Sequence, residues 1–193
     1  QQNSFTYFTV DARLSILNLF TIMDLSTLLK DYGAFNFWAN SHLVEWLLEK
    51  PAGLLEQETP SSFPTLKGTL LHIWSAEDIW LNRLKGVSPT RFLAADFTGT
   101  TAELFEGLLH RSAEFRDFLS TQDARFFENK TAYTHTSGVT YSQTNAEIIL
   151  HCLQHSTFHR GQIITMARSL GLTDVPHTDY ILYARQRALP PPL

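Results

Sequence analysis

The segment HCLQHSTFHRGQ, residues 151–162, decides how the rest of the chain is interpreted. It lies within residues 146–170, which we expect to form one long helix. His151, His155 and His159 recur at intervals of four, and residues four apart lie on the same face of an α-helix. Neutral imidazole is the commonest protein ligand of transition metals, and two such histidines can bind one ion. The spacing therefore indicates a metal site, although a surface or half-buried histidine pair would show the same pattern.

Length and composition predict one globular domain. The chain has 193 residues, of which 44% are hydrophobic and 18% charged, as in an ordinary folded domain. The formal net charge is −4 and no basic run occurs, so we expect neither a nucleic-acid partner nor a membrane partner. The one cysteine, Cys152, excludes an intramolecular disulfide and favours a cytoplasmic location. We expect Cys152 to be a small buried side chain and not a metal ligand.

Residues 1–22 are interpreted separately from the domain. They lack the basic region and cleavage site of a signal peptide. Their longest apolar patch, residues 14–22, is too short and too interrupted to span a bilayer. We therefore expect residues 1–22 to be an N-terminal extension outside the core, and we assign residues 23–193 to a single domain.

Apolar residues recur at intervals of three and four in four long stretches, which is the period of an amphipathic helix. We expect helices from about residue 24 to before residue 51, and over 65–85, 101–121 and 146–170. Asp24 or Ser26 would cap the first helix and Asn145 the last. Residues 127–144 alternate polar and apolar side chains around a Ser137-Gly138 turn, which predicts a short β-hairpin or extended segment.

Together these elements predict an all-α fold, a four-helix bundle with a short hairpin or extended segment before the last long helix. Residues 176–187 could add a short terminal helix. Sites in such bundles are built from inward side chains of facing helices. If the second and fourth helices face each other, His72 can meet His155 and His159. Taken alone, however, a histidine at the edge of an apolar stripe is more often a hydrogen-bonded boundary residue.

From about residue 23 to 187 the chain resembles the DinB family, also called the DinB/YfiT-like metalloenzymes. The resemblance rests on the motifs YGAFNFWAN (32–40), TLLHIWSAEDIW (69–80) and HCLQHSTFHRGQI (151–163). Three further features lie in the expected places, namely the turn around Gly138, the pair Leu170-Gly171 and the pair Asp179-Tyr180.

This resemblance implies a four-helix bundle that binds one divalent metal ion, usually zinc or nickel. The family's ligands are one histidine of the second helix and two of the last, which in this sequence are His72, His155 and His159. His151 would then be a neighbour of the site and not a ligand. Three histidines with open positions for water also suit iron or manganese.

Several polar side chains are candidates for supporting the ligands. Glu77, Gln154 and Gln162 lie about one turn from the expected ligands and could hydrogen-bond a free imidazole nitrogen, or belong to the helix surface. Asn40 and Trp38 on the first helix could line the pocket. We expect Arg160 to pair with a carboxylate on the bundle surface rather than to bind an anionic substrate group.

The resemblance leaves three functional hypotheses open. Active members of the wider superfamily look like transferases or isomerases that use low-molecular-weight thiols such as mycothiol or bacillithiol, with the metal lowering the thiol pKa. We therefore expect thiol-dependent S-transferase-like chemistry on a small-molecule substrate. The alternatives are a metal-dependent hydrolase, with Glu77 or His151 as candidate general bases, and a non-catalytic stress-associated metal-binding protein. The resemblance also implies a homodimer.

Overall fold

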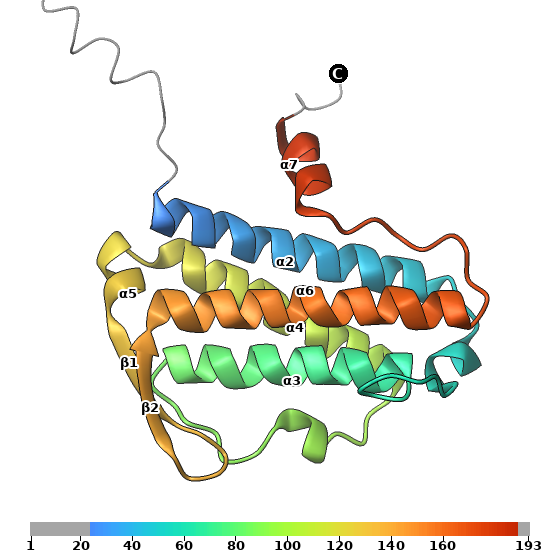
Figure 1. Cartoon of the computed structure of the whole chain (residues 1–193), viewed down its shortest axis with the longest axis horizontal. Helices are drawn as coiled ribbons and strands as arrows, with labels where there is room; N and C mark the ends of the chain where they lie inside the picture. Colours follow the sequence, from blue (N-terminus) through green and yellow to red (C-terminus); the bar gives the residue numbers. More distant parts are fainter. Residues whose placement is uncertain (1–23, 189–193) are drawn as a thin grey trace, which may run out of the picture.

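The computed structural model of the chain describes residues 24–188, in which four long helices form a bundle (Figure 1). They are α2 (Leu25–Leu48), α3 (Leu66–Leu84), α4 (Thr101–Thr121) and α6 (Asn145–Ser169). The predicted all-α four-helix bundle is therefore confirmed. The extension predicted for residues 1–22 lies outside the described residues.

The four helices form a closed ring in which α2 and α3 each contact both α4 and α6. Helices α3 and α4 run in the same direction, because the segment between them returns along the length of the bundle (Figure 1). Helix α6 runs antiparallel to α3 beside it. The predicted second and fourth helices thus share an interface, and this interface carries the candidate site.

Shorter elements connect and cover the bundle. The 3-10 helices η1 (Ala52–Glu56) and η2 (Leu93–Ala95) and the helix α5 (Ala124–Glu128) lie in the connections, and α7 (Tyr180–Ala188) follows α6. Strands β1 (Lys130–Thr134) and β2 (Thr140–Thr144) pair antiparallel, as the sequence predicted. Gly138 takes a φ of 87° in their turn, a conformation that side chains with a Cβ rarely adopt. None of the helices within residues 24–188 is both long and apolar enough to cross a membrane.

The start of α6 corrects one prediction from the sequence. The N-cap is Thr144 and not Asn145, because Glu147 stands three residues after Thr144 and completes a capping box. Thr144 Oγ1 accepts from the Glu147 backbone N–H at 3.2 Å, and Glu147 Oε2 accepts from the Thr144 backbone N–H at 2.8 Å. Asn145 instead ties the hairpin to the bundle, since it accepts from Thr131 Oγ1 at 2.6 Å and donates to the Phe126 carbonyl at 2.9 Å. Asp24, one of the two predicted candidates, is the N-cap of α2.

Two apolar clusters fill the bundle, one toward each end. One cluster includes Leu43, Leu70, Leu108 and Ile163. The other includes Leu81, Phe115, Leu119, Leu153 and, as expected for a small buried residue, Cys152.

Between the two clusters lies a set of buried polar side chains that we call the polar layer. Its members come from all four long helices and are Asn36, Asn40, Glu77, Ser112, Ser156 and Arg160. Because the layer occupies the middle of every long helix, it lies beside the segment of α6 that carries the histidines.

Candidate metal centre

Three histidines converge in the interface between α3 and α6. Nε2 of His155 lies 2.9 Å from Nε2 of His72 and 3.1 Å from Nε2 of His159. One ring nitrogen from each residue lies within 4.8 Å of the others. Two nitrogens bound tetrahedrally to one zinc ion lie roughly 3.3 Å apart, given Zn–N distances of about 2.05 Å. The three imidazoles, which we call the histidine cluster, are therefore spaced closely enough to bind a single ion.

Burial keeps the imidazoles of the cluster neutral. His159 is buried, and His72 and His155 are half-buried. Burial, and secondarily the charges of neighbouring histidines, lowers the pKa of His72 to about 4 and that of His155 to about 3. Burial also lowers the pKa of His159. Near neutral pH each ring therefore offers a nitrogen lone pair, which is the form that binds metals.

Gln162 orients one ring of the cluster. His159 Nδ1 lies 2.7 Å from Gln162 Oε1, and an amide oxygen can only accept, so Nδ1 carries the proton. The lone pair of His159 then lies on Nε2, which faces the other two histidines. Phe63 stacks on the His72 ring, with ring centroids 4.1 Å apart. Gln162 was one of three supporting residues considered from the sequence, and it is the one in contact with a histidine of the cluster.

His151 lies beside the cluster without joining it. Its ring centroid is 6.0 Å from that of His155, and it packs edge-on against Trp80 at 5.0 Å. The remaining two sequence candidates support other parts of the structure. Gln154 is exposed, and Glu77 belongs to the polar layer.

Arg160 follows His159 in sequence but points into the core, which contradicts the predicted surface ion pair. Its Nη1 donates to Asn36 Oδ1 at 2.7 Å and to Asn40 Oδ1 at 2.9 Å. Consecutive residues point about 100° apart around a helix, so one can face the α3 interface while the next faces α2. Asn40 is fully buried in this network, and it is not among the residues that line the pocket beside the histidine cluster within the described part of the chain. Burial lowers the pKa of Arg160 to about 10, and Glu77 opposes that shift.

Glu77 is the negative counterpart of Arg160 in the polar layer. Its Oε1 accepts from Asn36 Nδ2 at 2.7 Å, from Asn40 Nδ2 at 2.9 Å and from a serine of α6 at 3.1 Å. Its Oε2 accepts from Ser112 Oγ at 2.5 Å. The two asparagines therefore bridge a buried carboxylate to a buried guanidinium. Asn36 and Asn40 are two polar residues four positions apart within the apolar face of the first long helix, and this pattern in the sequence could have identified them.

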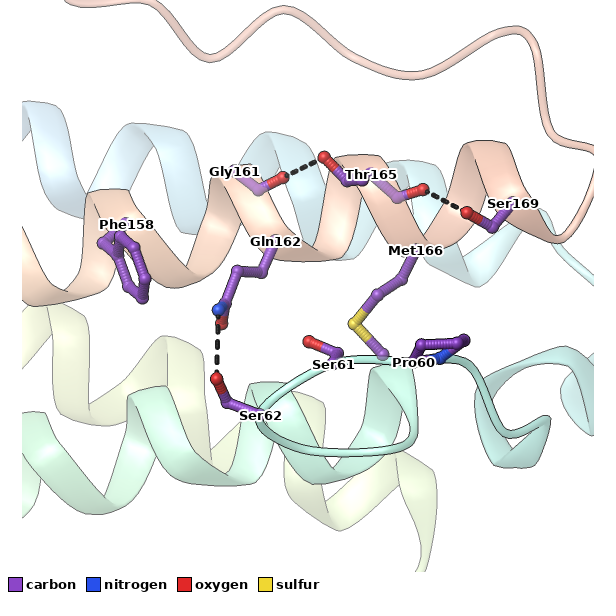
Figure 2. A pocket seen from close by; sticks show the side chains of 9 residues that line it. All are labelled: Pro60, Ser61, Ser62, Phe158, Gly161, Gln162, Thr165, Met166 and Ser169. Carbon is purple, nitrogen blue, oxygen red and sulfur yellow. Dashed lines mark hydrogen bonds between the residues drawn. The ribbon is translucent and has the colours of Figure 1, made fainter.

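A pocket of about 550 Å³ opens next to the histidine cluster, between α6 and the segment that precedes α3. It is lined by Pro60, Ser61, Ser62, Phe158, Gly161, Gln162, Thr165, Met166 and Ser169 (Figure 2). Gln162 reaches from α6 toward Ser62 and donates to its Oγ at 3.3 Å. The same side chain thus contacts the cluster and lines the pocket.

Comparison with known proteins gives two matches. The family model described as the DinB family matches residues 23–190, a range that contains the whole histidine cluster. Protein DinB of Bacillus subtilis (strain 168) is 30% identical over 155 residues, which cover 77% of this chain and 89% of that protein.

Proposed function

The chain belongs to the DinB family, and we propose that it is an enzyme that depends on one divalent metal ion bound by its histidine cluster. The observation that supports this most directly is the convergence of three Nε2 atoms from His72, His155 and His159. Three protein ligands leave coordination positions open, as in catalytic rather than structural metal sites. The ligands are nitrogens on rigid helices, and they suit zinc or nickel first, with iron or manganese as alternatives.

We further propose thiol-dependent, S-transferase-like chemistry on a small-molecule substrate. A divalent ion at the cluster would stabilise the thiolate form of a low-molecular-weight thiol at neutral pH. In the transfer, the thiol proton passes to solvent, sulfur bonds to an electrophilic carbon, and the leaving group departs with its bonding electrons. The pocket beside Gln162 offers Phe158 and Met166 as apolar contacts for the electrophile.

The placement of Glu77 supports thiol transfer over hydrolysis. Attack by a water needs a general base close to that water, whereas a thiolate is already deprotonated. Glu77 was a candidate base, but its carboxylate accepts hydrogen bonds from four side chains of the polar layer inside the core. His151 is the other candidate general base. If His151 deprotonates a water in the reaction, this would support the hydrolase alternative.

A thiol panel tests this function. The metal-loaded protein is expected to couple a low-molecular-weight thiol to chlorodinitrobenzene faster than the uncatalysed reaction, and chelation is expected to remove the excess rate. The His155→Ala protein serves as the matched control without a complete cluster. Ester hydrolysis that needs metal but no thiol would instead support the hydrolase alternative. Loss of thermal stability on chelation, without turnover of thiols or esters, would support the non-catalytic alternative.

Replacing Gln162 with leucine is expected to weaken Zn²⁺ binding by roughly 10- to 100-fold. The change keeps the side-chain volume but removes the acceptor that fixes the proton on His159 Nδ1. Affinity can be measured by titration against a chromogenic chelator. Gln154→Leu, at an exposed position of the same helix, is expected to bind zinc like the natural protein. Equal affinities of both variants would contradict a supporting role for Gln162.

Three other expectations from the sequence stay proposals. We propose a homodimer, for which the exposed side chains of Leu28 and Leu150 beside one apolar pocket offer a self-complementary surface. We also propose a cytoplasmic location and a single domain over residues 23–193.

A further inference from the structure

Gly161 lies in the interior of α6, where a glycine is unfavourable unless something requires it. Glycine destabilises a helix interior relative to alanine, because it loses more backbone freedom on folding. In α4 the reason for a glycine is close packing, since a Cβ at Gly107 would come within 2.1 Å of the Trp74 ring. A Cβ at Gly161 would meet no atom within 4 Å beyond its own stretch of α6. Packing within the described part of the protein therefore does not explain this glycine.

The open space at Gly161 belongs to the pocket of about 550 Å³ beside the histidine cluster (Figure 2). Gly161 is exposed and lines this pocket together with Phe158 and Thr165, which lie about one turn before and one turn after it on α6. Close approach of a ligand to the backbone is one of the recurring reasons for a glycine. The missing side chain therefore leaves bare helix backbone accessible to a molecule in the pocket.

Phe158 adds an aromatic surface to the pocket on the side of the histidine cluster. The residue is 62% exposed, although phenylalanine is among the residues most often buried. Its ring centroid lies 5.1 Å from that of His159, and the two rings meet edge-on. A molecule resting on Phe158 would thus lie next to a member of the cluster. The exposed ring and the bare backbone at Gly161 together suit a flat, apolar ligand.

The pocket offers little to an anion. None of its lining residues in the described part of the chain is an acid or a base. The hydroxyl groups of Thr165 and Ser169 each donate to a backbone carbonyl of α6 at 3.1 Å, so they present only lone pairs to a ligand. Gln162 already donates to Ser62. Burying a charge without a partner is costly, and an uncharged ligand avoids this cost.

We propose that this pocket binds an uncharged, flat aromatic electrophile, which lies against the α6 backbone at Gly161 and against the Phe158 ring. Both residues then determine specificity, Gly161 by leaving space and Phe158 by contacting the ring. That the bound molecule is the electrophile rests on the function proposed above, whereas the binding of uncharged aromatic molecules does not. In the transfer, the thiol proton passes to solvent, sulfur bonds to a carbon of the bound ring, and the leaving group departs with its bonding electrons.

Titration of the full-length, metal-free protein with dinitrobenzene, followed by NMR, tests the pocket without a reaction. Dinitrobenzene lacks the chlorine that leaves from chlorodinitrobenzene, and the metal is omitted because it could bind a carboxylate directly. The natural protein is expected to bind dinitrobenzene with a Kd of about 1 mM or below, and dinitrobenzoate at least about tenfold more weakly. Equal affinity for the two compounds would contradict a pocket for uncharged molecules.

Replacing Gly161 with leucine is expected to weaken dinitrobenzene binding at least about tenfold, because the new side chain occupies the pocket. Phe158→Leu is expected to weaken it as well, since leucine is apolar but lacks a flat ring. Phe92→Leu is the matched control, because Phe92 is also exposed, at 38%, but is not among the lining residues. This variant is expected to bind dinitrobenzene like the natural protein. Equal affinity of Gly161→Leu and the natural protein, or no binding by the natural protein at millimolar concentrations, would overturn the proposal.

Thermal unfolding distinguishes a role of Gly161 in binding from a role in packing. Gly161→Ala is expected to raise Tm by about 2–4 °C, because alanine favours the helix and its Cβ meets open space. Gly107→Ala is the matched control and is expected to lower Tm, because its Cβ would collide with Trp74. A lower Tm for Gly161→Ala would show that packing requires the glycine, and would contradict the proposal.

Kinetics of the metal-loaded protein then test whether the bound molecule is the electrophile. At equal metal content, Gly161→Leu is expected to raise KM for chlorodinitrobenzene at least about tenfold and to leave KM for mercaptoethanol unchanged. The opposite split would place the thiol in the pocket and would overturn the assignment to the electrophile. Absence of thiol turnover in the natural protein would contradict the proposed function, while dinitrobenzene binding to the metal-free protein would still support the pocket.

Discussion

Replacing His155 with alanine is expected to weaken the binding of Zn²⁺ or Ni²⁺ by more than about 100-fold. His155 is the central member of the cluster, since its Nε2 is within 3.1 Å of both other Nε2 atoms. Loss of a residue that only supports a ligand already costs about 10- to 100-fold in affinity, and loss of a direct ligand costs more. Elemental analysis of the purified variant gives its stoichiometry, and competition with a chelator gives its affinity.

His151→Ala provides the matched control for this experiment. His151 lies one turn before His155 on the same helix, but its nitrogens are not part of the cluster. We expect this variant to retain a full equivalent of metal. A full equivalent in His155→Ala would contradict the ligand assignment, and selective loss in His151→Ala would show that His151 is a ligand.

Replacing Arg160 with methionine is expected to destabilise the fold by roughly 3–5 kcal/mol, as is usual when one partner of a buried charge pair is removed. The variant leaves the Glu77 carboxylate in the core without its positive counterpart, and both asparagine carbonyl oxygens lose a donor. Denaturant titration, followed by circular dichroism, measures the free energy of unfolding.

Two comparisons separate this effect from the loss of any arginine. Arg91 pairs with Asp96 at 2.6 Å on the surface, and Arg91→Met is expected to cost less than about 1 kcal/mol. Adding Glu77→Gln to Arg160→Met is expected to recover part of the lost stability, because neither charge is then buried. A cost for Arg160→Met no greater than that for Arg91→Met would contradict the role of the polar layer.

The helices could be predicted from the sequence because their signals are local. The three-to-four spacing of apolar residues is visible within each helix, and the hairpin turn at Gly138 is equally local. The N-cap of α6 was misplaced by one residue because Thr144 and Asn145 are both good caps. Only the reciprocal bonds with Glu147 decide between them.

The histidine cluster was predictable in part. Spacing along one helix pointed to His155 and His159, but it equally admitted His151. The resemblance to the DinB family implied His72 as the third member and set His151 aside. The structure brings these three rings together because α3 and α6 pack side by side in opposite directions.

The environment of Arg160 could not be predicted, because its partners lie 120 and 124 positions away in the sequence. A charged residue in the middle of a helix is usually a surface residue. Only the packing of α2 against α6 reveals the two asparagines as acceptors.

The polar layer also sets the axial alignment of the helices. Apolar surfaces tolerate sliding, but a shift of α6 against α3 by one turn, about 5.4 Å, would separate Ser156 and Arg160 from Glu77. The same shift would carry His155 and His159 past His72. The core charges therefore keep the two halves of the histidine cluster in register in the protein without metal. We accordingly expect the metal affinity proposed for the cluster to depend on a carboxylate and a guanidinium that are not among its ligands.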